Sequence, residues 1–282
     1  MRDLEGRTAI VTGASRGIGP FIARALCDEG MNVVLVARTA GALEELASQL
    51  GAAGSRAIAV PADLGDRPSL DRIVDATISN FGTIDVLVNN AALVNTARFS
   101  RQAEEEIDEM IAVNLSAGLL LTRRILPGMI ERGRGHVVML SSLAGKVGSP
   151  YEAVYASTKA GQIAFVQSLR PELEGTGVGA SAVCPGFVGE TGMWEDVAGP
   201  AGVRAPRLVG STTPAAVAAA TVRAIRSDVP ELLVNRPPMR PTIALGEVSP
   251  RLRYWLLRRL GVNRAFQRVV EHHETIATQS DS

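Results

Sequence analysis

The chain has 282 residues, 46% of them hydrophobic and 21% charged, and its formal net charge at pH 7 is zero. This length favours one large α/β domain with a sizeable core over two small domains. A zero net charge gives no reason to expect a nucleic-acid partner. The two cysteines, Cys27 and Cys184, are too few for a disulfide framework and have no metal-ligand spacing, so we predict no metal site.

The N-terminus carries charged residues and then a strand-like run, without the apolar core of a signal peptide. No apolar run in the sequence approaches the length that spans a bilayer. We therefore expect a cytoplasmic protein.

Short apolar, β-branched runs alternate with helical patterns along the first 235 residues. Several of these runs are continuously apolar, which is typical of strands that helices cover on both faces. The alternation predicts an α/β fold with a doubly wound, seven-stranded parallel sheet flanked by helices. The expected strands are residues 8–12, 32–37, 57–61, 86–89, 136–141, 179–184 and 231–234, and the main expected helices are 40–50, 69–80, 104–131 and 154–174.

Two segments depart from this alternation. Residues 187–213 are rich in Gly, Pro and Ala, and a long irregular segment of this kind predicts a lid or binding loop. Residues 236–282 follow the predicted domain 1–235 as a helical C-terminal extension, which opens on a proline-rich stretch that we do not expect to be helical. Ser249 and Pro250 then have the pattern of an N-cap and a first helical residue.

A glycine-rich loop stands between the first predicted strand and the helix after it. Gly13, Gly17 and Gly19 allow a tight turn and a close backbone approach to a pyrophosphate. The free N–H groups of the following helix favour the same anion. A purely structural turn is the alternative for a lone glycine cluster, but the strand–turn–helix context favours a dinucleotide site.

The residue after the second predicted strand indicates which dinucleotide is bound. An NAD site usually has an Asp or Glu there, which accepts a hydrogen bond from the ribose 2′-hydroxyl. This chain has Arg38 instead, and Arg16 adds a second cation from the glycine loop. Because two arginines can bind a 2′-phosphate, we predict NADP(H), with two solvated surface arginines as the alternative. Asp63 is placed to contact the adenine or to cap the next turn.

The motifs as a set resemble those of the short-chain dehydrogenase/reductase family, over residues 4–235. They are TGASRGIG at 12–19, Asp63-Leu64, NNAA at 89–92, Asn114, Ser141-Ser142, YASTK at 155–159 and PGFV at 185–188. The resemblance implies a Rossmann-type fold, an oxidoreductase that acts on a small-molecule carbonyl or alcohol, and a homodimer or homotetramer.

The resemblance also implies the site residues. The catalytic group would be Asn114, Ser142, Tyr155 and Lys159. The cofactor would be bound by Gly13, Ser15, Arg16, Gly17, Ile18, Gly19, Arg38, Asp63, Leu64, Asn89, Asn90, Ala91, Tyr155, Lys159, Pro185, Gly186 and Val188.

The chemistry of these residue types agrees with that assignment. Reduction of a ketone needs a hydride, which a nicotinamide supplies, and a proton, which the protein must supply. Lys159 is four residues after Tyr155 and therefore on the same helix face, where its ammonium is predicted to lower the pKa of the phenol. Ser142 follows a predicted strand and can stabilise charge on the substrate oxygen. The alternative for the Tyr–Lys pair alone is an ordinary amphipathic helix.

The predicted cavity mouth and the C-terminal extension leave alternatives open. An apolar substrate site, or simple packing of the lid, is indicated by Leu93, Ser142, Leu143, Val147, Phe187 and Trp194. The extension has no acid between Ser249 and Val270, but it has Trp255 and the arginines Arg251, Arg253, Arg258, Arg259, Arg264 and Arg268. Packing on the domain or a partner subunit is favoured over peripheral contact with an anionic membrane.

The sequence as a whole predicts an NADP(H)-dependent ketone reductase that acts on an apolar substrate. The alternative is a catalytically idle NADP-binding sensor, or a membrane-recruited binding module, on the same fold.

Overall fold

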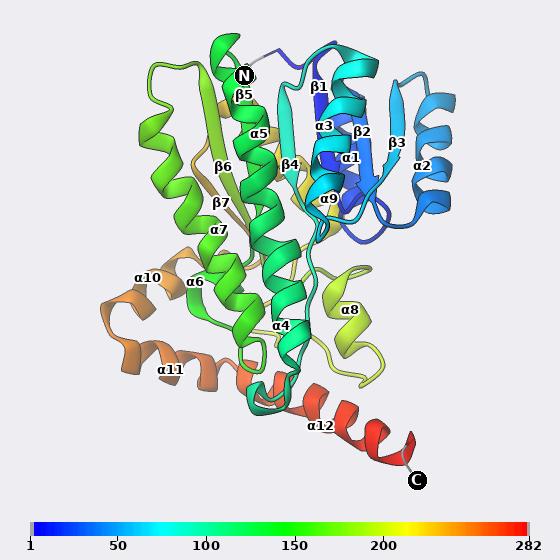
Figure 1. Ribbon diagram of the computed structural model, residues 1–282. Helices are drawn as coiled ribbons and strands as arrows, with labels where there is room; N and C mark the ends of the chain where they lie inside the picture. The colour runs from blue at the N-terminus through cyan, green and yellow to red at the C-terminus, as the bar shows by residue number, and fades with distance from the viewer. Residues whose placement is uncertain (1–2, 281–282) are drawn as a thin grey trace.

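A seven-stranded parallel sheet forms the centre of the molecule in the computed structural model, which describes residues 3–280 (Figure 1). The strand order is β3-β2-β1-β4-β5-β6-β7, so the chain reverses its winding direction between β1 and β4. The strands are β1 (Thr8–Thr12), β2 (Asn32–Ala37), β3 (Ala57–Pro61), β4 (Val86–Asn89), β5 (Gly135–Leu140), β6 (Val178–Pro185) and β7 (Glu231–Val234). The predicted doubly wound sheet is confirmed, and only β5 and β6 differ from their expected bounds, by one residue at each end.

Helices cover both faces of the sheet, which explains why the strands are apolar throughout. One face packs against α1 (Gly19–Asp28), α2 (Ala40–Ala52) and α9 (Pro214–Ser227). The other packs against α3 (Arg67–Phe81), α5 (Ala117–Glu131) and α7 (Ala153–Glu172). Successive residues of β1 alternate between the two layers, Ile10 facing the second and Val11 the first, as the period of a strand requires.

The predicted helix over 104–131 contains a π-turn. Its parts are α4 (Glu104–Ile111), the π-turn at Ala112–Ser116 and α5. A π-turn inside an α-helix is frequently found at a functional site, and Asn114 lies in this one. By length and composition alone, this continuous helix could cross a membrane, which the sequence analysis did not anticipate. Its Leu121, Ile125 and Met129 side chains lie in the protein core instead.

The predicted lid, residues 187–213, and the C-terminal helices lie together beyond the carboxyl edge of the sheet (Figure 1). The lid contains α8 (Met193–Ala198), and the short α6 (Ala144–Val147) lies nearby. The C-terminal segment forms α10 (Arg240–Val248), α11 (Pro250–Arg259) and α12 (Val262–Ser280). α10 was not expected, because the prolines before it suggested a stiff coil. Pro241 stands in the first turn of α10, where the N–H that proline lacks needs no partner.

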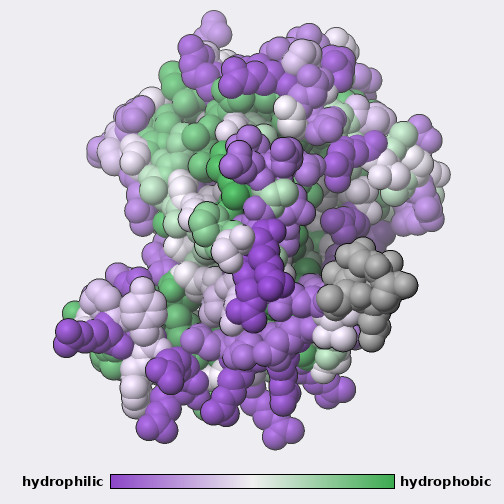
Figure 2. All heavy atoms as spheres, turned by 60° about the horizontal axis from the view of Figure 1, so that its bottom comes forward, coloured by the Kyte–Doolittle hydropathy of each residue, from purple (hydrophilic) through white to green (hydrophobic). Residues whose placement is uncertain are grey.

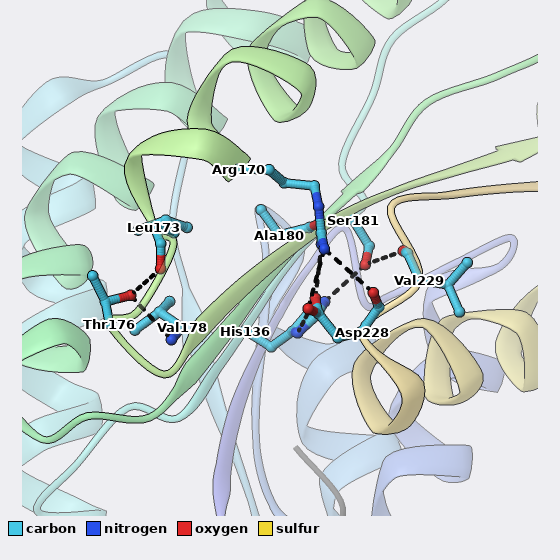
Figure 3. A network of polar contacts seen from close by, with 9 residues as sticks. All are labelled: His136, Arg170, Leu173, Thr176, Val178, Ala180, Ser181, Asp228 and Val229. Atoms are coloured by element: carbon cyan, nitrogen blue, oxygen red, sulfur yellow. Dashed lines mark hydrogen bonds and ion pairs between the residues drawn. The ribbon is translucent and has the colours of Figure 1, made fainter.

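A polar network closes the opposite, amino-terminal edge of the sheet (Figure 3). His136 Nε2 lies 2.8 Å from Ser181 Oγ, so β5 and β6 are joined by side chains. Arg170, in the last turn of α7, donates to Ala180 O on β6 (2.6 Å) and to Asp228 Oδ1 (2.7 Å) at the end of α9. His136 therefore has a structural role in this network.

Substitution of His136 by glutamine tests this network through the pH dependence of stability. Burial lowers the pKa of His136 to about 3, so the unfolded chain binds a proton between pH 6.5 and 3 that the folded chain does not. Stability is therefore lost as the pH falls through that window. We expect the loss of unfolding free energy from pH 7 to pH 5 to be about 2 kcal/mol smaller in His136→Gln, measured by urea denaturation. If His136→Gln loses as much unfolding free energy from pH 7 to pH 5 as the wild type, the structural role of His136 is contradicted. An equally large effect of the control His272→Gln would contradict it as well.

Candidate active site

A cavity of about 360 Å³ opens at the carboxyl ends of the strands, next to the reversal between β1 and β4. Ligands of open α/β sheets bind at this place, because the loops after the two neighbouring strands run in opposite directions. One end of the cavity is formed by the glycine loop and by Arg38 after β2. The other is formed by the end of β5, by α7, by the lid and by the C-terminal helices.

Two glycines of the loop are required by close backbone contacts. Gly13 has φ +65°, and a Cβ added there would lie 2.7 Å from the Ala91 Cα. A Cβ at Gly19 would collide with the carbonyl oxygen of Gly13. The loop therefore packs tightly against the end of β4 and the start of α1, which leaves the amino end of α1 directed at the cavity. This geometry fits a cradle for the pyrophosphate of a dinucleotide.

The side chains of Thr12 and Asn90 join the end of β1 to the end of β4. Thr12 Oγ1 accepts hydrogen bonds from the backbone N–H groups of Asn90 (3.0 Å) and Ala91 (3.1 Å). Asn90 Nδ2 donates in return to Thr12 O (2.9 Å) and Gly13 O (3.1 Å). Asn90 thus shapes the glycine loop through its side chain, while it also lines the cavity. The role of Thr12 was not recognised in the sequence.

Arg16 and Arg38 both line the cavity, and each is held by an exposed carboxylate. Arg16 Nη1 lies 3.0 Å from Asp196 of the lid, and Arg38 Nη1 lies 3.5 Å from Glu109 of α4. Exposed ion pairs of this kind contribute little free energy, so either guanidinium can exchange its carboxylate for a phosphate. The pair Arg16–Asp196 also connects the lid to the glycine loop.

Ser142, Tyr155 and Lys159 converge on the same part of the cavity wall. Lys159 is only 2% exposed, and its Nζ donates to Leu140 O on β5 (2.7 Å). Ser141 Oγ donates to the carbonyl oxygen of Lys159 (2.7 Å), so α7 and the end of β5 are bonded in both directions. The Lys159 Nζ stands 5.6 Å from the centre of the Tyr155 ring. The predicted face of α7 is therefore the one that borders the cavity.

The electrostatics of Tyr155 differ from the sequence-based prediction. Burial raises the pKa of the Tyr155 phenol, and the charge of Glu152 raises it further, while a hydrogen bond with Ser142 lowers it. Burial also lowers the pKa of Lys159 to about 7. The prediction that Lys159 lowers the pKa of Tyr155 is therefore wrong, because desolvation determines the direction of the pKa shift of both side chains. At neutral pH the phenol is protonated.

Asn114 and Gln162 lie behind this wall. The Asn114 side chain bonds both backbone groups of Leu93, at 2.6 Å to the N–H and 2.8 Å to the carbonyl oxygen. Its own carbonyl oxygen accepts from Gln162 Nε2 (2.5 Å), and Gln162 Oε1 lies 3.4 Å from Lys159 Nζ. A chain of hydrogen bonds therefore leads from the π-turn to the buried lysine. Gln162 was missed in the sequence, where it stands on the expected face of α7, three residues after Lys159.

Glu152 is a second group that sequence reasoning missed. It lines the cavity and is 7% exposed, and its carboxylate accepts from Thr96 Oγ1 (2.9 Å) and Ser149 Oγ (2.7 Å). Burial raises the pKa of Glu152 to about 7. These bonds fasten the loop after β4 to the segment before α7.

All six residues predicted at the substrate mouth line the cavity, namely Leu93, Ser142, Leu143, Val147, Phe187 and Trp194. The Phe187 and Trp194 rings are 4.4 Å apart, and Trp194 packs at 5.2 Å against Phe266 of α12. The C-terminal helices contribute a further part of the wall that the sequence did not predict. Its side chains include Met239, Thr242, Ile243, Arg253, Leu256, Leu257, Leu260, Val262 and Phe266.

Most of the predicted cofactor residues also line the cavity, but Gly19, Asp63 and Asn89 do not, and neither does Asn114 of the predicted catalytic group. Asp63 Oδ1 accepts from the Gly65 N–H (2.8 Å), so it caps the turn after β3. Asn89 is buried at the end of β4 next to Gly118 of α5, and its amide atoms have no hydrogen-bond partner among the described residues.

Comparisons of sequence and structure show which known proteins this chain resembles. A family model described as short chain dehydrogenase matches residues 7–200. The ketoacyl reductase HetN of Nostoc sp. is 42% identical over 255 residues, which are 89% of this chain and 88% of that protein. A 3-oxoacyl acyl-carrier-protein reductase of Synechocystis sp. is 36% identical over 198 residues, 70% of this chain and 80% of its own. A solved metagenomic short-chain oxidoreductase in complex with NADP aligns with a TM-score of 0.70 and 33% identity, covering 82% of this chain and 98% of that one.

Proposed function

Because the chain belongs to the short-chain dehydrogenase family, we propose that it is an NADP(H)-dependent reductase that transfers a hydride to the carbonyl carbon of an apolar ketone. The observation that carries the proposal is the convergence of Ser142, Tyr155 and Lys159 on one cavity. The other end of that cavity carries the glycine loop and two arginines.

The proposed cofactor is NADP(H), which supplies the hydride when it is bound. The tight glycine loop would hold the pyrophosphate at the amino end of α1, and Arg16 and Arg38 would bind the 2′-phosphate. No acidic residue stands after β2, where an NAD site would use one. The NADP complex of the metagenomic relative supports the same choice.

The proposed proton donor is Tyr155. Its raised pKa keeps the phenol protonated at neutral pH, which suits donation to a ketone oxygen as the hydride reaches the carbon. The Ser142 hydroxyl, hydrogen-bonded with that phenol, would hold the same oxygen and stabilise the charge that develops there. The reaction leaves an alcohol and a Tyr155 phenolate. Lys159 would stabilise the phenolate as an ammonium, and the phenol is restored by a proton from solvent.

The proposed substrate class is an apolar ketone of the β-ketoacyl type. The cavity beyond Ser142 is lined by Leu143, Val147, Phe187 and Trp194, and it continues along the leucines of α11. Burial of an acyl chain there is favourable by about 0.8 kcal/mol for each CH₂ group. Two of the relatives are named as ketoacyl or oxoacyl reductases, which supports this class.

Substitution of Tyr155 by phenylalanine tests the proposed proton donor. We expect NADPH-dependent reduction of a β-ketoacyl ester to fall by about 10²–10⁴-fold, because the phenylalanine has no proton to give. NADPH affinity should stay within about twofold, and Tyr151→Phe, which keeps the active-site hydroxyl, should retain activity. If wild type and Tyr155→Phe both bind NADPH but neither reduces any ketone of a broad panel, the protein is a cofactor sensor and the proposal fails.

Substitution of Arg38 by aspartate tests the cofactor assignment. The new carboxylate repels the 2′-phosphate, so we expect the Kd for NADPH to rise about 10–100-fold, while the Kd for NADH changes little. Isothermal calorimetry or quenching of protein fluorescence measures both values. Arg24→Asp, on the outer surface of α1, is the matched charge reversal and should leave both nearly unchanged. Tighter binding of NADH than of NADPH by the wild type would contradict the assignment.

A further inference from the structure

The outer surface of α10 and α11 exposes large apolar and aromatic side chains. Val248 is 77% exposed, Tyr254 67%, Trp255 52% and Leu245 49%. No residue of α11 is buried. Figure 2 shows the side of the molecule on which these helices lie, where apolar and pale residues alternate with hydrophilic ones at the lower left. We call these four residues, with the exposed Arg251, Arg258 and Arg259, the α11 face.

The charged side chains of α11 are all arginines, namely Arg251, Arg253, Arg258 and Arg259. The nearest acid is the exposed Glu247 of α10. Arg253 is the one that turns inward: it lines the cavity and pairs with Glu247 at 3.0 Å. The Arg259 guanidinium lies 5.3 Å from the Trp255 ring, so cation and aromatic side chain share one surface.

α12 does not belong to this surface. Its apolar side chains Val262, Phe266 and Val269 are buried against Trp194 and Val209 of the lid. Of the two alternatives for the C-terminal extension, packing on the domain therefore applies to α12. The aromatic side chains of α11, in contrast, are exposed to solvent.

We propose that the α11 face docks on an anionic lipid membrane. Tyr and Trp are the side chains that favour the membrane–water interface, because their rings combine an apolar body with a polar group. Arginines on the same face are attracted to anionic headgroups. A second copy of this chain is a poorer occupant, because a symmetric contact brings Arg258 and Arg259 of one copy toward the same arginines of the other.

The side of α11 opposite the α11 face connects the docking to substrate entry. Leu256, Leu257 and Leu260 line the cavity, so a single helix separates the docked surface from the proposed active site. An apolar ketone can then pass from the lipid along α11 to Ser142 and Tyr155 without crossing bulk water. This step rests on the proposed function, whereas the docking itself does not.

Vesicle co-sedimentation of the full chain tests the docking without any activity readout. The probes are phosphatidylcholine vesicles with and without an equal share of phosphatidylglycerol, at low salt. We expect binding to the anionic vesicles only, and about fivefold weaker partitioning for each arginine removed in Arg258→Gln/Arg259→Gln. Trp255→Ala should weaken binding at any salt, whereas the exposed Arg123→Gln/Arg223→Gln pair, on α5 and α9, is the charge-matched control. Point variants are preferred to truncation, because the extension forms part of the cavity wall.

Equal sedimentation of the wild type and both arginine pairs, or no sedimentation with anionic vesicles, overturns the proposal. A concentration-dependent dimer in sedimentation velocity that Trp255→Ala abolishes also overturns it, because a second copy then covers the face. We expect Arg258→Gln/Arg259→Gln to reduce a water-soluble ketone at the wild-type rate. This result would separate the membrane docking from the proposed reductase function. If that reduction is absent in the wild type while vesicle binding is present, the proposed function fails and the docking stands.

Discussion

Burial of Lys159 is the constraint on which the arrangement of the candidate active site depends. A lysine that is 2% exposed must place its Nζ against an acceptor, and it finds Leu140 O at the end of β5. The returning bond from Ser141 to the Lys159 carbonyl joins α7 to that strand end, and Gly145 lets α6 approach the α7 backbone closely. Ser142 and Tyr155 are thereby held on one wall. Burial lowers the pKa of Lys159, and burial of Tyr155 itself raises the pKa of the phenol. The packing of this wall therefore both positions the phenol and keeps it protonated.

The remainder of the site is assembled from loops that are fastened to one another across the sheet. Thr12 and Asn90 join the ends of β1 and β4 behind the glycine loop, and Glu152 joins the loop after β4 to the segment before α7. Arg16 reaches the lid through Asp196 by a weak, exposed pair. The buried connections preserve the shape of the cavity, whereas the exposed pair can be exchanged for a ligand at little cost in free energy.

Much of this could be predicted from the sequence, because the information is local. Continuously apolar runs located the strands, and the four-residue spacing of Tyr155 and Lys159 placed them on one helix face. The sequence did not reveal the sign of the Tyr155 pKa shift, since burial is a property of the tertiary structure. Helix α10 was not predicted, because the proline-rich stretch before it is typical of an irregular segment. The leucines of α11 were recognised as helical, but their spacing does not say which surface they cover, so their place in the cavity wall was not foreseen.

The central claim is that a hydride crosses from NADPH to a ketone held at Ser142 and Tyr155. NADPH that carries deuterium on the transferring side of its nicotinamide C4, incubated with the protein and a medium-chain β-ketoacyl ester, tests this directly by mass spectrometry of the product. The account predicts one deuterium on the new carbinol carbon and none exchanged with water. An alcohol without deuterium, or deuterium retained entirely in the oxidised cofactor, would contradict it.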